Sequence, residues 1–263
     1  MSFRSHIYKK RFFRILIFIF ILYLSACVTT EYGTGTHRRD IFFYSSEKEV
    51  EIGRNLNQHI HREKIISKNP KDIERISRIA SRIVEVCDRK EINYYFYIID
   101  EDEKNAFSIP GGYVYIYSGL MNILDDDELG FVIAHEVAHI VSRHSIKKLQ
   151  AAMGMNLLIL ATAKVESTPN FHQGLSFALA QILTAYSRED EFNADELATK
   201  YLNLAGLNPK SGVEVLEKLY RESKKAPPQM YSYFKTHPYV DQRIKRIKEY
   251  LGLPLNIKDY LND

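Results

Sequence analysis

The stretch DDDELGFVIAHEVAHIVSRHS, residues 125–145, decides the fold because it joins a helix start to a nearly all-apolar helix that carries histidines one turn apart. The aspartates supply an N-cap and a favourable first-turn charge, so we expect the helix to begin at Asp125. At about 100° per residue, His135 and His139 lie on one face, with Glu136 beside them. Two imidazoles at this spacing can share a Zn²⁺, and the neighbouring carboxylate can reach a water bound to it.

The remaining positions of this helix are mostly apolar, which predicts burial nearly all round. Burying two histidines and a glutamate without a partner would be costly, so the burial supports a metal more strongly than the five-residue pattern does alone. His144 falls about 180° from His135 on the wheel, and we expect it to be an exposed helix-end residue stabilised by the dipole. Ser142 and Ser145 stand where the metzincin extension needs glycine and histidine. The third protein ligand must therefore come from elsewhere.

A second stretch, SREDEFNADE at residues 187–196, packs five carboxylates into ten residues. With Ser187 as N-cap, Glu191 and Asp195 fall on the stripe of the helix that faces the core. Buried carboxylates usually coordinate metal or are paired, so we assign Glu191 to the zinc and Asp195 to a hydrogen bond that orients a ligating imidazole. The other three acids fit a solvated helix start: Glu189, Asp190 and Glu196.

The N-terminus has the layout of a secretory signal peptide, with a basic region, a ten-residue apolar run over 15–24 and small residues after it. Residues 24–27, LSAC, resemble the lipobox of bacterial lipoproteins, which implies cleavage before Cys27 and lipidation of that cysteine. Val28 then implies an anchor in the outer membrane, with the domain in the periplasm. An uncleaved membrane anchor is the alternative, although the apolar run is far short of the ~20 residues that span a bilayer.

Charge gives no sign of a nucleic-acid partner. The formal charge of +3 comes from residues 1–26, which hold five of the 36 basic residues and none of the 33 acids. Neither a basic stripe nor a basic motif remains without them. Cys87, the only other cysteine, falls on the apolar face of a predicted helix, so a disulfide framework is excluded.

The length of 263 residues allows one domain with a full hydrophobic core. Periodicity predicts helices over 46–67 and 69–89, two short strands over 92–100 and 111–119, and helices from 125 almost to the end. We therefore expect an α+β fold, mainly α-helical with a small β-sheet. The expected organisation is a signal peptide over 1–26, a tether over 27–45, one domain over 46–251 and a tail over 252–263. The apolar run 149–163 favours a buried core helix over a membrane-dipping hairpin.

HEVAH, SREDEFNAD and NAFSIPGGYVYIYSGL (residues 105–120) together resemble the gluzincin metallopeptidases that include HtpX, the CAAX prenyl proteases and the periplasmic BepA-type lipoproteins. The resemblance covers about residues 45–250 and implies a zincin-type metallopeptidase domain with one zinc per chain. By it, Glu191 is the third zinc ligand. The chain lacks the several membrane spans of HtpX and the repeat domain of the BepA type, so it is most similar to compact, single-domain periplasmic lipoproteins.

Two further elements gain a role from this resemblance. THPYVDQR matches a family element in which His237 and Arg243 are six residues apart. His237 would stabilise the oxyanion or, in a resting enzyme, occupy the open zinc position; the alternative is a cap residue before Pro238. Three residues look like part of the family's substrate edge strand, to which an extended peptide adds, or else form a simple strand cap: Asn105, Ala106 and Phe107.

The leading hypothesis is a zinc metalloendopeptidase that cleaves misfolded or stalled cell-envelope proteins. Glu136 would act as general base toward a zinc-activated water. The substrate class follows from the resemblance and the expected location, and from no particular residue. The alternative is a lipoprotein scaffold or chaperone with a latent or structural zinc site. Glu136 argues against that alternative, since zinc binding does not require it.

Overall fold

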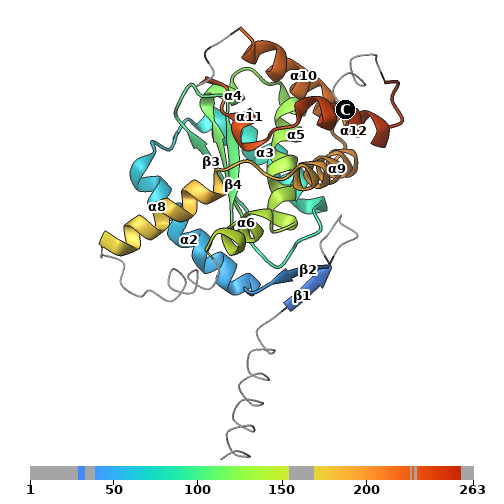
Figure 1. The fold of residues 1–263 in the computed structure, drawn as a ribbon. Helices are drawn as coiled ribbons and strands as arrows, with labels where there is room; N and C mark the ends of the chain where they lie inside the picture. Colours follow the sequence, from blue (N-terminus) through green and yellow to red (C-terminus); the bar gives the residue numbers. More distant parts are fainter. Residues whose placement is uncertain (1–28, 33–38, 154–168, 226, 228–229, 256–263) are drawn as a thin grey trace, which may run out of the picture.

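The structure is a computed structural model that describes residues 29–32, 39–153, 169–225, 227 and 230–255 (Figure 1). The predicted signal peptide, Cys27, the C-terminal tail after Leu255 and most of the run 149–163 lie outside the described residues. Within the expected tether, β1 (Thr29–Tyr32) and β2 (Arg39–Phe42) pair as a two-stranded antiparallel ribbon, which the sequence did not predict.

The first two predicted helices are present. In α2 (Ser46–Glu63), the side chain of Ser45 accepts a hydrogen bond from the backbone of Lys48, and in α3 (Pro70–Val86) Asn69 is the cap and Pro70 fills the first turn. The prediction that the first helix continues to residue 67 was wrong. The chain becomes extended at Lys64, and Ile66 forms a bridge with Ile99 of the sheet, so a tertiary contact ends the helix early.

A three-stranded mixed sheet follows, in the order β3–β5–β4. The central strand β5 (Tyr113–Tyr117) pairs in parallel with β3 (Tyr95–Ile99) and antiparallel with β4 (Ala106–Ile109). The tight connection between β4 and β5 uses Gly111 and Gly112 at positive φ of 81° and 95°. β4 is therefore the outer strand on its side of the sheet.

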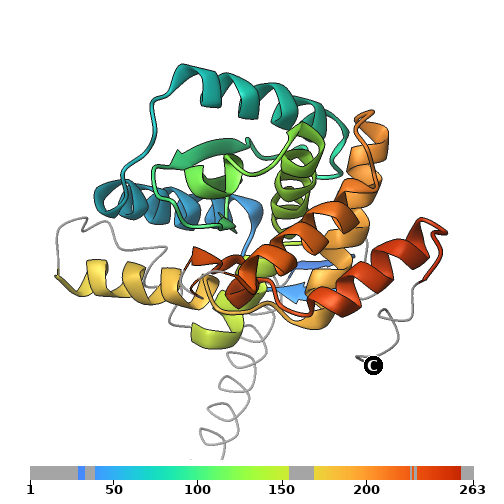
Figure 2. The ribbon, with the colours of Figure 1, turned by 90° about the horizontal axis from the view of Figure 1, so that it is seen from above.

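The sheet separates two hydrophobic cores, because side chains alternate along β5. Val114 and Ile116 belong to the core shared with α3 and the later helices, whereas the three tyrosines of β5 belong to the core under α2. Helix α5 (Asp126–Val141) is the centre of the first core, and every residue from 128 to 141 is buried. Seen from above, it stands between α3 and α9 (Arg188–Leu204) (Figure 2).

The other helices surround this centre. They are α4 (Ser118–Met121), α6 (His144–Met153), α8 (Pro169–Ile182), α10 (Ser211–Ser223), α11 (Tyr233–Thr236) and α12 (Val240–Tyr250). Helix α9 packs against α5 and α12, while α6 and α8 pack against each other beside α2. The predicted mainly helical α+β class with a small sheet is confirmed. None of the helices in the described ranges is both long and apolar enough to cross a membrane.

Candidate metal centre

The two histidines of α5 face one another at the buried centre of the molecule. A capping box between Asp125 and Glu128 starts the helix, as the aspartate run predicted. His135 and His139 are fully buried, and their Nε2 atoms lie 3.0 Å apart. Helical spacing thus presents two imidazole nitrogens toward one point, as the sequence implied.

Helix α9 brings a carboxylate to the same point. Glu191 is fully buried, with Oε1 3.5 Å from His139 Nε2 and Oε2 3.6 Å from His135 Nε2. Ser187 caps this helix by accepting from the backbone of Asp190. The helical-wheel choice of Glu191 among five acids therefore matches its position in the structure.

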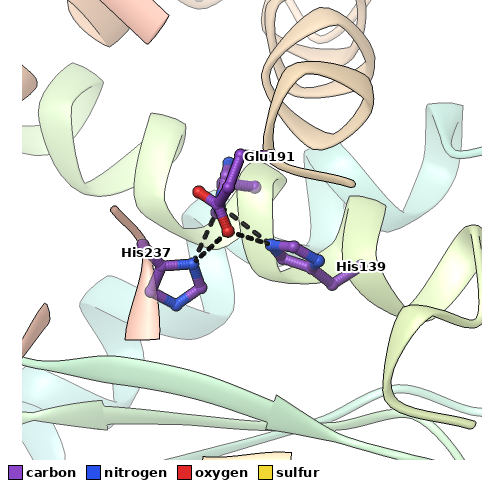
Figure 3. Close-up of side chains that lie close together, drawn as sticks. His139, Glu191 and His237 are labelled. Atoms are coloured by element: carbon purple, nitrogen blue, oxygen red, sulfur yellow. Dashed lines mark hydrogen bonds and ion pairs between the residues drawn. The ribbon is translucent and has the colours of Figure 1, made fainter. Parts of the chain in front are cut away.

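The fourth group comes from the loop after α11. His237 is fully buried, and its Nδ1 lies 3.3 Å from His135 Nε2 and 3.1 Å from Glu191 Oε1. Figure 3 shows this ring and that of His139 on either side of the Glu191 carboxylate. The ligand atoms of all four residues lie within 4.8 Å of one another.

The chemistry of this cluster fits a zinc ion. Imidazole nitrogens and carboxylate oxygens are zinc ligands, and three or four of them complete a site. Among the described residues, neither carboxylate oxygen of Glu136 accepts a hydrogen bond. A buried carboxylate without such a partner is costly unless a cation lies nearby. His135, His139 and Glu191, with His237, are the residues that would hold the metal.

Glu136 lies beside the cluster without joining it. Its side chain is fully buried, and Oε1 is 3.3 Å from His237 Nε2, although the geometry there is not that of a hydrogen bond. An acceptor left free next to a metal site can take a proton, as a general base must. Glu136 thus lies next to the ligand cluster, against the ring of His237.

Asp195 and Arg243 support the ligands from behind. Asp195 Oδ1 lies 2.9 Å from His135 Nδ1, and both Asp195 oxygens accept from Arg243, at 2.8 and 2.7 Å. Arg243 NH1 is also 2.8 Å from Glu191 Oε2. Burial alone would raise the pKa of both carboxyls, but Arg243 brings the pKa of each below its ordinary value, with His237 adding to the effect on Glu191. Both carboxylates are therefore ionised near neutral pH.

The expectation that His144 is exposed was wrong. Helix α5 ends at Val141, and Arg143 adopts a positive φ of 56°, so His144 begins α6 and points back into the molecule. It is 1% exposed, and its Nδ1 lies 2.8 Å from Nδ1 of His139. A helical wheel misplaces His144 because the chain leaves the first helix through a turn that the sequence does not reveal.

Asp190 also has more than the dipole role that was predicted. Its Oδ1 lies 3.4 Å from His144 Nε2 and 3.4 Å from Lys147 Nζ, and its side chain is only 15% exposed. Two tyrosines were missed as well. Tyr186 stacks on His139 with ring centroids 3.9 Å apart, and Tyr233 stacks on His237 at 4.6 Å. The sequence pattern marks neither ring: Tyr186 lies just before α9 and Tyr233 is the first residue of α11, and neither belongs to a motif of its own.

The predicted substrate strand is β4, the outer strand beside α5. Asn105, Ala106 and Phe107 are all buried, and the Phe107 ring stacks on Tyr115 at 4.9 Å, within the core under α2. Just before the strand, Lys104 donates from its backbone to Met230 and accepts from Tyr233. The Phe107 side chain is thus part of the core and does not face a ligand.

Comparison with known proteins agrees with this geometry. A family model, "Peptidase family M48", matches residues 70–251, which include all the residues of the cluster. The chain is 28% identical to mitochondrial metalloendopeptidase OMA1 of Schizosaccharomyces pombe over 67% of this chain and 52% of that protein. It is also 28% identical to the beta-barrel assembly-enhancing protease of Yersinia pestis, over 64% of this chain and 37% of that one. With metalloprotease LoiP of Escherichia coli the identity is 28% over 69% of this chain and 71% of that protein. The chain thus spans about half of the first relative and about a third of the second.

Proposed function

The chain belongs to peptidase family M48, and from that premise we propose that it is a zinc-dependent endopeptidase acting on misfolded or stalled cell-envelope proteins. One observation carries the proposal. Four ligand atoms lie within 4.8 Å of one another beside a buried Glu136 whose oxygens accept no hydrogen bond from the described residues. A scaffold or chaperone with a structural zinc would need the four ligands but would not need Glu136.

The contacts suggest a role for each residue of the site. His135, His139 and Glu191 would hold one Zn²⁺, which supplies a Lewis acid and lowers the pKa of a coordinated water toward neutrality. Glu136 accepts the proton of the attacking water and delivers it to the leaving amine. Asp195 holds the proton on Nδ1 of His135, 2.9 Å away, so the Nε2 lone pair faces the cluster.

His237 has two roles in this proposal. With Nδ1 at 3.1 Å from Glu191 and 3.3 Å from His135, it serves as the fourth protein ligand in the resting enzyme. During turnover the same imidazole leaves that position and donates to the oxyanion of the tetrahedral intermediate. His237 lies between α11 and α12, so its ring belongs to neither helix of the other ligands.

The substrate is an extended peptide segment that adds to β4. Edge strands bind peptides through backbone hydrogen bonds, which favours unfolded chains over folded ones. The position of β4 as the outer strand next to α5 supports this mode. Asn105, Ala106 and Phe107 would take part through their main chain, since the Phe107 ring is in the core.

The proposed location is the periplasm. Cleavage before Cys27 would leave a lipidated N-terminus in the outer membrane, a tether over 27–45 and a peptidase domain over 46–251. The lipobox-like LSAC supports the anchor. The name of one relative, the beta-barrel assembly-enhancing protease, supports envelope proteins as substrates. Mass spectrometry of the protein purified from a bacterial envelope should find acyl chains on Cys27, and an intact residue 1–26 segment would refute this processing.

The test compares the full chain, purified in detergent with zinc, with its Glu136→Gln variant on an unfolded outer-membrane protein and on casein. We expect the variant to lose ~10²- to 10⁴-fold in cleavage rate while keeping one zinc per chain. Glu189→Gln, whose side chain is 63% exposed, is the matched control and should cleave normally. Equal inertness of the wild type and Glu136→Gln, both with one zinc bound, would refute the peptidase and favour the scaffold.

A further inference from the structure

We infer that His144 and Asp190 are positioning residues, which hold His139 in the tautomer and orientation that ligate the metal. The inference rests on the metal site of the proposed function. It depends on a chain of three side chains, His139, His144 and Asp190, in which α5, α6 and α9 each contribute one.

The direction of the hydrogen bond between the two histidines follows from the distances. His139 Nε2 points into the ligand cluster, 3.0 Å from His135 Nε2. A ligating imidazole needs its lone pair on that nitrogen, so its single proton lies on Nδ1. Nδ1 is 2.8 Å from His144 Nδ1, which therefore accepts. The proton of His144 is then on Nε2, the nitrogen 3.4 Å from Asp190 Oδ1.

Neighbouring groups hold the Asp190 carboxylate in place facing this N–H. Ser187 Oγ donates to its Oδ2 at 2.7 Å, and Lys147 Nζ lies 3.4 Å from Oδ1. Asp190 therefore receives a hydroxyl donor on one oxygen and faces an ammonium group with the other. A carboxylate acceptor at this end favours His144 with its proton on Nε2 and, through it, His139 with its proton on Nδ1.

The two histidine ligands are therefore supported in different ways. His135 meets its carboxylate directly, since Asp195 lies 2.9 Å from its Nδ1. His139 reaches a carboxylate only through a second imidazole. Tyr186 stacks on the His139 ring with planes 20° apart, which limits tilting of the ring but does not choose between its nitrogens. That choice is left to His144.

Two substitutions at one position separate hydrogen bonding from packing. His144→Asn keeps an acceptor near the place of Nδ1, whereas His144→Phe keeps the ring volume without an acceptor. Zinc affinity of the full chain, measured by competition with a chelator, should fall ~10- to 100-fold in His144→Phe and less than about tenfold in His144→Asn. Two-bond ¹H–¹⁵N NMR of the zinc-free protein should show the Nδ1–H tautomer of His139 in the wild type and a mixture of tautomers in His144→Phe.

Asp190 supplies an independent test if His144→Phe does not fold. Asp190→Asn should lower zinc affinity about threefold or more and broaden the tautomer signal of His144, whereas the exposed Glu189→Gln should change neither. His61→Phe, at an exposed histidine that packs edge-on against Tyr97, controls for loss of an imidazole.

The outcomes distinguish this inference from the proposed function. A wild-type chain that binds no zinc would refute the metal site itself. If the wild type binds zinc, equal affinity of a folded His144→Phe would refute only the positioning role. Equal losses in His144→Asn and His144→Phe would also refute it, since packing would then be the cause. If Asp190→Asn changes neither the zinc affinity nor the tautomer signals, Asp190 does not position His144.

Discussion

Nδ1 of His237 lies 3.1 Å from Oε1 of Glu191, and these residues are 46 positions apart in the chain. The contact places an imidazole from a loop among the ligands that two helices supply. Tyr233 stacks on the other side of this imidazole, and Tyr239, two residues after it, adopts a positive φ of 63°. A non-glycine residue in that conformation costs free energy, so the loop is held against local strain.

His237→Ala tests both roles of this residue. Removing the fourth ligand should weaken zinc binding by about tenfold, measured by chelator competition. Removing an oxyanion donor should lower kcat ~10²- to 10³-fold with little change in KM. Faster cleavage by the variant would contradict the oxyanion role and leave His237 only as a group that blocks the site.

Glu191→Gln tests the ligand assignment from the acidic stretch. The amide oxygen binds zinc more weakly than a carboxylate does, so we expect most of the zinc to be lost during dialysis, as measured by mass spectrometry of the metal. Glu189→Gln, two residues earlier and on the exposed face, should keep one zinc per chain. Equal loss from both variants would refute the wheel assignment.

Arg243→Gln tests the support behind the ligands. Arg243 is fully buried and bonded to two carboxylates, so its loss leaves two buried charges without a counter-ion. The free energy of unfolding of the zinc-free protein, from urea titration, should fall by about 3–5 kcal/mol. Arg246→Gln, on the same helix at an exposed pair with Glu249, should change it by less than about 0.5 kcal/mol. Similar effects of the two substitutions would contradict the proposed role.

Lys148 gives the protein a pH-dependent stability. Burial lowers the pKa of Lys148 to about 8, and its Nζ donates to the carbonyls of Ile182 and Thr184 at the end of α8. The unfolded chain still binds this proton up to pH ~10.4, so between these values the unfolded state binds more protons and stability rises with pH.

Lys148→Met removes this contribution of Lys148 to the pH dependence of stability. Between pH ~7.5 and ~9.5, the free energy of unfolding of the zinc-free wild type should gain about 2 kcal/mol relative to the variant. Urea titrations of both proteins across this range measure it, and other titrating groups cancel in the difference. If the difference in free energy of unfolding between the two proteins stays constant across this pH range, Lys148 is charged throughout and the prediction is wrong.

Much of the site could be predicted because several of its residues lie one helical turn apart or on one face of a helix. One turn of helix fixes the relation of His135 to His139, and the same geometry separates Glu191 from Glu189. The position of His144 could not be predicted in this way. A wheel describes one helix only, and the chain reverses at Arg143 through a left-handed residue that carries no glycine signal.

Tertiary contacts also changed boundaries that periodicity suggested. The first long helix stops at Glu63 because the following residues pair with the sheet at Ile99, and a pairing partner 33 residues away leaves no local pattern. The role of Tyr186 likewise depends on where α8 ends relative to α5.

The sequence by itself therefore determined the elements that depend on neighbours within about one turn: the caps, the buried α5, the paired histidines and the inward face of α9. Only the tertiary structure decided which groups stand behind the ligands. Packing of α5 against α9 brings Asp195 to His135, and packing of α12 against α9 adds Arg243 behind them. The turn into α6 brings His144 to His139, and the first turn of α9 brings Asp190 to His144. These distances depend on how separate segments cross, and that is set by the fit of whole helix faces rather than by local spacing.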